Sequence, residues 1–275
     1  MKLVTFHHKN KLRLGALRGD RIVDLTAAEV ADSMLDLIQA GPKGLKKAAS
    51  VLKDKAAKTV PLEGTRLASP IPRPGKILCS GINYKGHADE NPNAKMPSVV
   101  IGHDDVIPFP SQTQQRDYEV EFTAVIGKPL SRCAEADVMP ALFGYTLLHD
   151  VSARDVQFKD NQITLGKNFD GFCPIGPCIV TADEMTAPDK VRLQTRLNGK
   201  LMQDGTTADW IFPLPRLISF LSHVMALEPG DVVSTGTPAG IGLFRSPQVF
   251  LKPGDSVEIE AEGIGILRNR IGKSL

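Results

Sequence analysis

The 275-residue sequence has no long hydrophobic run and no block of like charge. Its apolar stretches fall short of the roughly 18 residues that mark a transmembrane helix, and its first residues lack the apolar core of a signal peptide. We therefore expect a cytoplasmic protein without a membrane partner. The 33 basic and 31 acidic side chains are scattered along the chain and leave a net charge of only +2. This distribution does not predict nucleic-acid binding.

Cysteine is scarce, and its spacing argues against two common roles. The sequence contains no Cys-x-x-Cys pair, and its histidines do not stand at zinc-ligand spacing. A redox motif and a zinc site are therefore both unsupported. We expect reduced, partly buried thiols at Cys79, Cys133, Cys173 and Cys178.

Proline and glycine are frequent, and their positions divide the chain. Residues 70–74 contain three prolines, a composition that continues neither a helix nor a strand. The preceding segment shows short strand patterns around a turn at residues 18–20, and then a helical pattern over Met34–Lys55. We predict a small N-terminal α+β domain over residues 1–70 and a second domain over residues 71–275.

The second predicted domain consists mainly of short apolar runs separated by glycine and proline. Its clearest helical pattern covers Pro213–Met225. This spacing favours a β-rich domain over a doubly wound α/β sheet. The predicted fold class is α+β, mostly β.

One strand pattern carries two acids on the same face. Glu119 and Glu121 alternate with Tyr118, Val120 and Phe122, so the two carboxylates project side by side. Their repulsion is relieved by a cation, and a hard divalent ion with oxygen ligands is a natural partner. The alternative is an amphipathic strand with a solvated polar face.

A second strand pattern, over residues 144–149, ends at Asp150. Ser152 is placed to cap a short helix on which Arg154 and Gln157, three residues apart, share one face. These residues predict a polar cluster at the end of a strand. The alternative is an ordinary helix cap with a surface arginine.

Three further segments carry weaker signals. His87 and Glu90 are three residues apart, so a helical turn would join an imidazole base to an orienting carboxylate. Lys167 follows a glycine and could supply a cation to a site. The loop Thr235–Thr237 offers backbone N–H groups and hydroxyls to an anion, although no phosphate-loop motif follows it. The alternatives are a solvent-exposed His–Glu pair for the first segment, a surface lysine for the second and an ordinary turn for the third.

Taken together and in this order, these segments resemble the fumarylacetoacetate hydrolase family from about residue 74 to residue 271. The segments that carry the resemblance are 81–90, 117–121, 144–145 with 150–157, 166–170, 174–177, 198–199 with Gln203, 229–231 and 235–238. The resemblance implies a β-roll catalytic domain and a homodimer, and it extends only loosely to the small N-terminal domain.

The resemblance also implies a role for each candidate residue. It places a divalent metal, Mg2+ with Mn2+ or Ca2+ as alternatives, on Glu119, Glu121 and Asp150. It makes His87, Glu90 and Lys167 catalytic. It assigns substrate binding to Tyr84, Arg154, Gln157, Thr235, Gly236 and Thr237.

The chain departs from the family pattern in ways that bear on substrate specificity. The segment between Lys95 and Pro110 is shorter than in many relatives, and His149 and Trp210 stand where relatives more often carry Asn and Met. We expect a small 2-keto acid substrate and hydrolysis of a C–C bond in an acylpyruvate or a 2,4-diketo acid. The alternatives are decarboxylation of an oxaloacetate-like acid or keto–enol isomerisation at the same site, and a non-catalytic scaffold.

Overall fold

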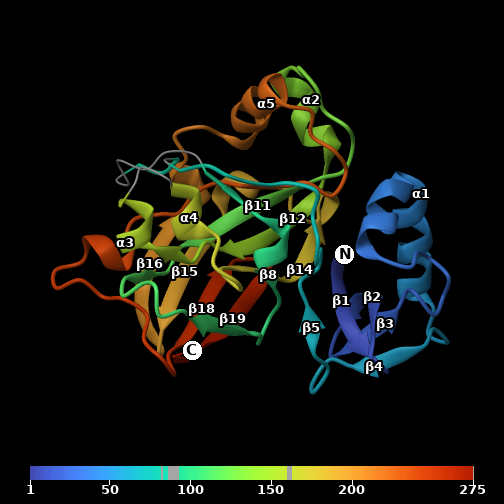
Figure 1. The fold of residues 1–275 in the computed structure, drawn as a ribbon. Coiled ribbons are helices and arrows are strands. Elements are labelled where there is room, and N and C mark those ends of the chain that lie inside the picture. The colour runs from blue at the N-terminus through green and yellow to red at the C-terminus, as the bar shows by residue number, and fades with distance from the viewer. Residues whose placement is uncertain (82, 86–92, 160–162, 275) are drawn as a thin grey trace.

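The computed structural model describes residues 1–81, 83–85, 93–159 and 163–274. Its N-terminal part contains antiparallel strands beside one long helix, α1 (Met34–Lys53) (Figure 1). The predicted turn and helix are confirmed: Gly19 lies in the turn at φ 61°, and α1 ends two residues before the predicted end. Ser33 begins α1 by accepting a hydrogen bond from the Asp36 N–H, and the helix kinks at Gly41.

The N-terminal strands continue into the main sheet of the molecule. β1 pairs antiparallel with β14, with Leu3 opposite Ile179, so a twelve-stranded sheet crosses the predicted boundary near residue 70. β5 attaches to β1, and β8 attaches to β14. The strands in order across the sheet, with these two last, are β4 (Thr59–Pro61), β3 (Arg21–Asp24), β2 (Lys11–Arg18), β1 (Lys2–His8), β14 (Cys173–Thr181), β12 (Leu142–His149), β11 (Val120–Ile126), β17 (Val232–Ser234), β6 (Ile77–Cys79), β7 (Asn93–Lys95), β5 (Leu67–Ala68) and β8 (Val100–Ile101).

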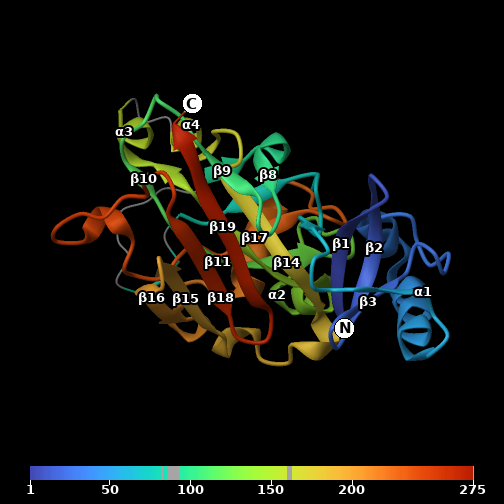
Figure 2. The same cartoon turned by 90° about the horizontal axis from the view of Figure 1, so that it is seen from below.

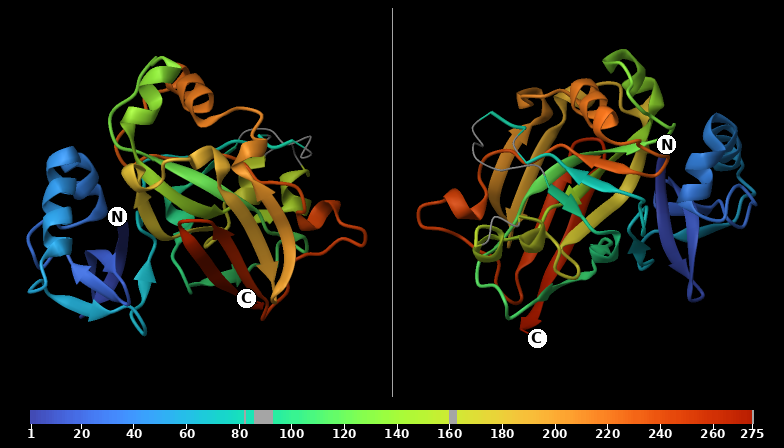
Figure 3. Two further views of the ribbon diagram at one scale, coloured as in Figure 1. Left: turned by 180° about the vertical axis from the view of Figure 1, so that it is seen from behind. Right: turned by 45° about the horizontal axis from the view of Figure 1, so that its top comes forward.

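A second sheet packs against the central strands of the first (Figures 2 and 3). The apolar core between them includes Phe122 and Leu147 from the main sheet and Leu193 and Ile259 from the second. The mostly β fold class is thereby confirmed. The second sheet has, in order, β16 (Lys200–Thr206), β15 (Arg192–Leu197), β18 (Ser256–Ala261), β19 (Gly265–Ser274) and β9 (Val106–Phe109).

The remaining helices are short and lie around the main sheet. α5 (Leu214–Val224) confirms the helix predicted over residues 213–225, and it packs on α2 (Glu135–Val138) above the sheet in Figure 1. α3 (Arg154–Gln157) and α4 (Ile163–Lys167) pack on each other. None of the helices in the described ranges combines the length and the apolar composition that a membrane-spanning helix requires.

The start of β11 and the end of β12 lie side by side because the two strands are antiparallel. Val120 is opposite His149, and the Asp150 N–H donates to the Glu119 carbonyl at 3.0 Å. On its other edge β11 pairs with β17, which in turn pairs in parallel with β6. Residues distant in sequence therefore meet at one place in the main sheet. A two-stranded ribbon, β10 (Arg116–Asp117) with β13 (Ser152–Ala153), lies next to it.

Candidate metal centre and active site

The three predicted metal ligands are neighbours on one buried face. Glu119 and Glu121 alternate along the chain with Val120 and Phe122, which belong to the apolar core, and Asp150 extends β12 beside Glu119. Glu119, Glu121 and Asp150 are each only 1% exposed. The alternative of a solvated polar face is therefore wrong. Buried carboxylates need compensating charge, so the groups that face them decide what the site can do.

Lys167 lies between two of these carboxylates. Its Nζ donates to Glu119 Oε2 and to Asp150 Oδ2, at 3.0 Å in each case. The lysine is fully buried at the end of α4, so the alternative of a surface lysine is wrong. Charge-assisted hydrogen bonds of this kind hold both carboxylates in fixed orientations.

Arg154 is held by a second buried set of partners. Its Nε donates to Asp117 Oδ2 at 3.0 Å, its Nη1 donates to Gln157 Oε1 at 2.9 Å, and its Nη2 donates to Glu119 Oε1. Asp117 also accepts the backbone N–H groups of Gly242 and Leu243. Burial raises the pKa of Asp117, and the Arg154 charge opposes that rise. The predicted shared face of Arg154 and Gln157 is confirmed, and the alternative of a surface arginine is wrong.

Ser152 does not cap the short helix as expected. Its hydroxyl donates to the Asp150 carbonyl at 2.9 Å, and α3 begins at Arg154 without a side-chain cap. Ser152 belongs to β13, so its backbone is extended and its hydroxyl turns back toward the end of β12. Its contact therefore fixes the turn that follows Asp150.

Glu121 faces the charge of the other acids. Burial raises its pKa well above the ordinary value, and the charges of Asp150 and Glu119 raise it further. Lys167 and a hydrogen bond donated by Ser234 oppose the rise. A nearby cation would strongly stabilise the ionised form of a carboxyl group that is buried among other acids.

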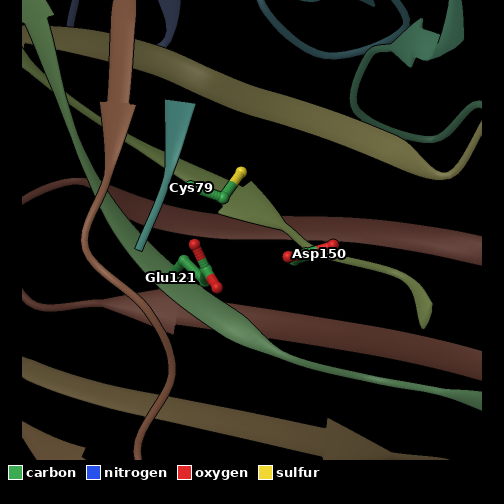
Figure 4. A group of neighbouring side chains, drawn as sticks. All are labelled: Cys79, Glu121 and Asp150. Carbon is green, nitrogen blue, oxygen red and sulfur yellow. The ribbon is translucent and has the colours of Figure 1, made fainter. Parts of the chain in front are cut away.

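Cys79 joins this cluster, although the sequence analysis assigned it no role. The Cys79 sulfur and carboxylate oxygens of Glu121 and Asp150 lie within 4.8 Å of one another (Figure 4). Burial raises the pKa of the Cys79 thiol. All four cysteines are free thiols as predicted, three of them buried and Cys133 half-buried.

Lys95 is the second residue that the sequence analysis missed. Its Nζ donates to the carbonyls of Val151, Lys167 and Phe172 at 3.3, 2.6 and 2.7 Å. It also lies 2.8 Å from Asp150 Oδ1. The Lys95 ammonium therefore lies between three backbone carbonyls and the Asp150 carboxylate, and it compensates part of the charge of that acid. The sequence offered no local signal for this burial.

The described residues suit a divalent cation. Four buried carboxylates, of Asp117, Glu119, Glu121 and Asp150, face three buried cations, of Lys95, Arg154 and Lys167, which leaves one negative charge when all are ionised. Oxygen-rich ligand sets of this kind suit Mg2+ or Mn2+. The assignment of the three ligands stays a prediction.

The threonine loop is fixed next to β11. The Thr235 hydroxyl donates to the Phe122 carbonyl at 2.8 Å, and the Thr237 hydroxyl accepts from Gln203 at 2.8 Å. Gly236 has φ 80°, and a Cβ there would lie 2.9 Å from the Ser80 carbonyl oxygen. Only glycine suits that backbone. The predicted substrate role of the loop remains to be tested.

Tyr84 is tied to the threonine loop through Trp210. The Trp210 Nε1 donates to the Tyr84 hydroxyl at 2.8 Å and lies 3.2 Å from the Thr235 hydroxyl. Tyr84 is buried in the apolar core, and this burial raises its pKa. Its described contacts support the loop, and its predicted substrate contact stays a prediction.

The predicted catalytic base His87 and its orienting carboxylate Glu90 lie outside the described residues. His149, which adjoins Asp150, is fully buried. Burial lowers its pKa to about 3, and the charge of Lys95 contributes to the lowering. His149 is therefore neutral at physiological pH.

A comparison with known proteins decides the family. The family description "Fumarylacetoacetate (FAA) hydrolase C-terminal" matches residues 76–272, which include every described residue of the site. The chain belongs to the fumarylacetoacetate hydrolase family. The predicted resemblance is thereby confirmed.

Members of this family with solved structures or curated names are similar over nearly the whole chain. The oxaloacetate tautomerase FAHD2B of Bos taurus mitochondria is 38% identical over 292 residues, covering 98% of this chain and 91% of the relative. The fumarylacetoacetate hydrolase structure from Exiguobacterium antarcticum has a TM-score of 0.90 at 34% identity, with 99% of each chain covered. The maleylpyruvate hydrolase from Sphingobium sp. SYK-6, in complex with manganese and pyruvate, has a TM-score of 0.88 at 30% identity, with all of both chains covered.

Proposed function

We propose that this protein is a divalent-metal-dependent tautomerase that interconverts the keto and enol forms of oxaloacetate or a closely related 2-keto acid. The observation that carries the proposal is the similarity to an oxaloacetate tautomerase over 98% of the chain. The buried acid cluster supports it, since Glu119, Glu121 and Asp150 are suited to hold Mg2+ or Mn2+. This proposal favours isomerisation over the C–C hydrolysis that we expected first from the sequence.

The described residues are suited to handle a proton at the substrate oxygen. A bound divalent metal supplies a Lewis acid that polarises a carbonyl group. Lys167 carries the ammonium group that lies within hydrogen-bonding reach of both Glu119 and Asp150, and it is proposed to donate to the developing negative oxygen. Arg154 keeps Glu119 in position and neutralises part of its charge.

Tautomerisation requires two balanced proton movements. One proton leaves carbon 3 of the 2-keto acid, the electron pair forms a C=C bond, and the carbonyl oxygen gains a proton. No co-reactant is consumed. The family resemblance implies that His87, oriented by Glu90, is a catalytic base, which in a hydrolase would deprotonate the attacking water. For tautomerisation we propose that the same base removes the carbon proton.

Hydrolysis of an acylpyruvate is the second candidate. The structural similarity to a maleylpyruvate hydrolase that holds manganese and pyruvate favours it. This reaction consumes water, breaks a C–C bond and releases pyruvate. Decarboxylation of oxaloacetate also yields pyruvate, but it releases carbon dioxide in place of a second carboxylic acid. The products therefore separate the three reactions.

The test follows the decay of enol absorbance of oxaloacetate with Mg2+, Mn2+ or EDTA, and analyses products from oxaloacetate and from an acylpyruvate. The proposal predicts metal-dependent acceleration above the rate with metal alone, without stoichiometric pyruvate. His87→Ala and Lys167→Met should retain the metal and lose the acceleration. Pyruvate with a carboxylic acid product would establish hydrolysis, and pyruvate with carbon dioxide would establish decarboxylation.

A further inference from the structure

We propose that Cys79 becomes a metal ligand when the centre holds a thiophilic divalent cation, so that Zn2+, Co2+ or Cd2+ binds through sulfur and oxygen together. Mg2+ would use oxygen ligands alone, because hard cations prefer oxygen and softer ones accept thiolate. The inference rests on the proposed metal centre and is independent of which reaction the centre catalyses. According to this inference, the Cys79 side chain sets how strongly the centre prefers thiophilic cations over Mg2+.

Strand pairing brings Cys79 to the carboxylates. Cys79 ends β6 and is in register with Ser234 of β17, and Ser234 donates its hydroxyl proton to Glu121 of β11. The Cys79 side chain consequently lies beside Glu121 and Asp150 in Figure 4. Three segments that are far apart in sequence thus supply one sulfur and two carboxylates to a single buried position.

The spacing of the three ligand atoms suits one ion. They lie within 4.8 Å of one another. Bonds of about 2.0–2.3 Å to a tetrahedral cation place ligand atoms roughly 3.5 Å apart, so an ion would draw them together by at most roughly 1.3 Å. Side-chain rotation can supply a movement of that size without a change in the strands.

The Cys79 sulfur is available to an ion. In the part of the chain that the structure describes, no group forms a hydrogen bond with the Cys79 sulfur, and the residue is 4% exposed. Asp150 Oδ1 lies 2.8 Å from the Lys95 ammonium, so a metal ion would bind this oxygen beside that contact or in place of it.

Sulfur ligation has a defined proton balance. The Cys79 S–H bond breaks, a metal–sulfur bond forms, and the proton passes to the buffer, with no change in oxidation state. A thiol ligates as the thiolate, so binding of a thiophilic ion releases at least this one proton. Mg2+ would leave the S–H bond intact.

The first test is a titration of the protein with Co2+, followed by thiolate-to-cobalt charge-transfer absorbance in the near ultraviolet. We expect this band in the wild type and its loss in Cys79→Ser. Cys178→Ala is the matched control, because Cys178 is an equally buried thiol that lies next to the Ile264 carbonyl. A wild type without the band, or a band that survives Cys79→Ser, would overturn the proposal.

The second readout is competition between cations. Cys79→Ser should weaken Cd2+ binding at least about tenfold and change Mg2+ binding much less. Equal loss for both ions would show a general disturbance of the site and overturn the specific role of sulfur. Mn2+ binding without a cobalt–sulfur band refutes this inference alone, whereas absence of any cation binding refutes the proposed function as well.

Discussion

The two faces of β11 are equally buried and are stabilised in opposite ways. One face carries Val120, Phe122 and Ala124, and the Phe122 ring lies 5.2 Å from Tyr145 and 5.8 Å from Trp210 between ring centroids. On the other face lies Glu121, with Glu119 one residue before the strand, and these two acids are surrounded by lysine, arginine and further carboxylates. A strict alternation of polar and apolar residues therefore does not imply that the polar face meets water.

This difference determines how mutations on each face of β11 affect the protein. Apolar packing is non-directional, so its stabilisation depends mainly on volume and buried area. A buried charge cluster depends on each partner, because removal of one leaves the others uncompensated. The first face should respond to mutation through stability, and the second through cation binding as well.

The largest expected loss of stability comes from emptying the apolar face. Phe122→Ala should lower the free energy of unfolding by about 4 kcal/mol, because it leaves a cavity in the core. Phe220→Ala, at an exposed position of α5, is the matched control and should change it by less than about 0.5 kcal/mol. Denaturant unfolding measures both. Similar losses in the two variants would contradict the packing described for Phe122.

Removing a buried cation should come next. Lys95→Met should cost about 3 kcal/mol in the metal-free protein, since Asp150 loses its ionic partner and three carbonyls lose their donor. Mg2+ should restore part of that stability by supplying positive charge at the same carboxylate. Lys200→Met, at an exposed position of β16, serves as control. Failure of Mg2+ to narrow the difference between wild type and Lys95→Met would argue against a cation site beside Asp150.

Neutralising one acid should separate stability from binding. Glu121→Gln should weaken Mg2+ binding by about a hundredfold, or roughly 2.7 kcal/mol, through loss of a charged ligand. The metal-free protein should not lose stability, because burial and like charge already disfavour the ionised Glu121. Calorimetric binding and thermal unfolding check the two parts. A large drop in metal-free stability with unchanged Mg2+ affinity would contradict the assignment of Glu121 as a metal ligand.

The smallest effect should be a pH dependence. The folded-state pKa of Glu121 is raised, so the folded protein keeps a proton that the unfolded chain has lost. Metal-free stability should therefore fall as pH rises from the ordinary carboxyl range through the raised pKa, while Mg2+ affinity should rise. Thermal unfolding in EDTA across pH measures the first trend. A slope identical in wild type and Glu121→Gln would rule out this contribution.

Local pattern was enough to predict some elements and not others. The alternation around Glu119 and Glu121 and the helical spacing over residues 213–225 depend on near neighbours, and both are confirmed. The position of Cys79 depends on the pairing of β6 with β17, which lies more than 150 residues along the chain. Lys95 is buried only because carbonyls from three separate segments meet at its Nζ.

The prediction for Ser152 failed for a related reason. Serine before a short helix is a common cap, but here the same hydroxyl can reach the carbonyl of Asp150 two residues earlier. The sequence does not show whether the Ser152 hydroxyl accepts a hydrogen bond from the start of the helix or donates one to the Asp150 carbonyl. Pairing with the neighbouring strand fixes the backbone and decides between the two. The roles of His87 and Glu90 and the homodimer remain predictions, and sedimentation would test the latter.

The central claim is that the polar face of β11 is a divalent-metal centre. Its most direct test is the binding of Mn2+ to the purified protein, followed by the electron paramagnetic resonance of free Mn2+. The account predicts one ion per chain in the wild type and greatly weakened binding in Glu119→Gln, Glu121→Gln and Asp150→Asn. No binding to the wild type, or binding that survives all three substitutions, would contradict it.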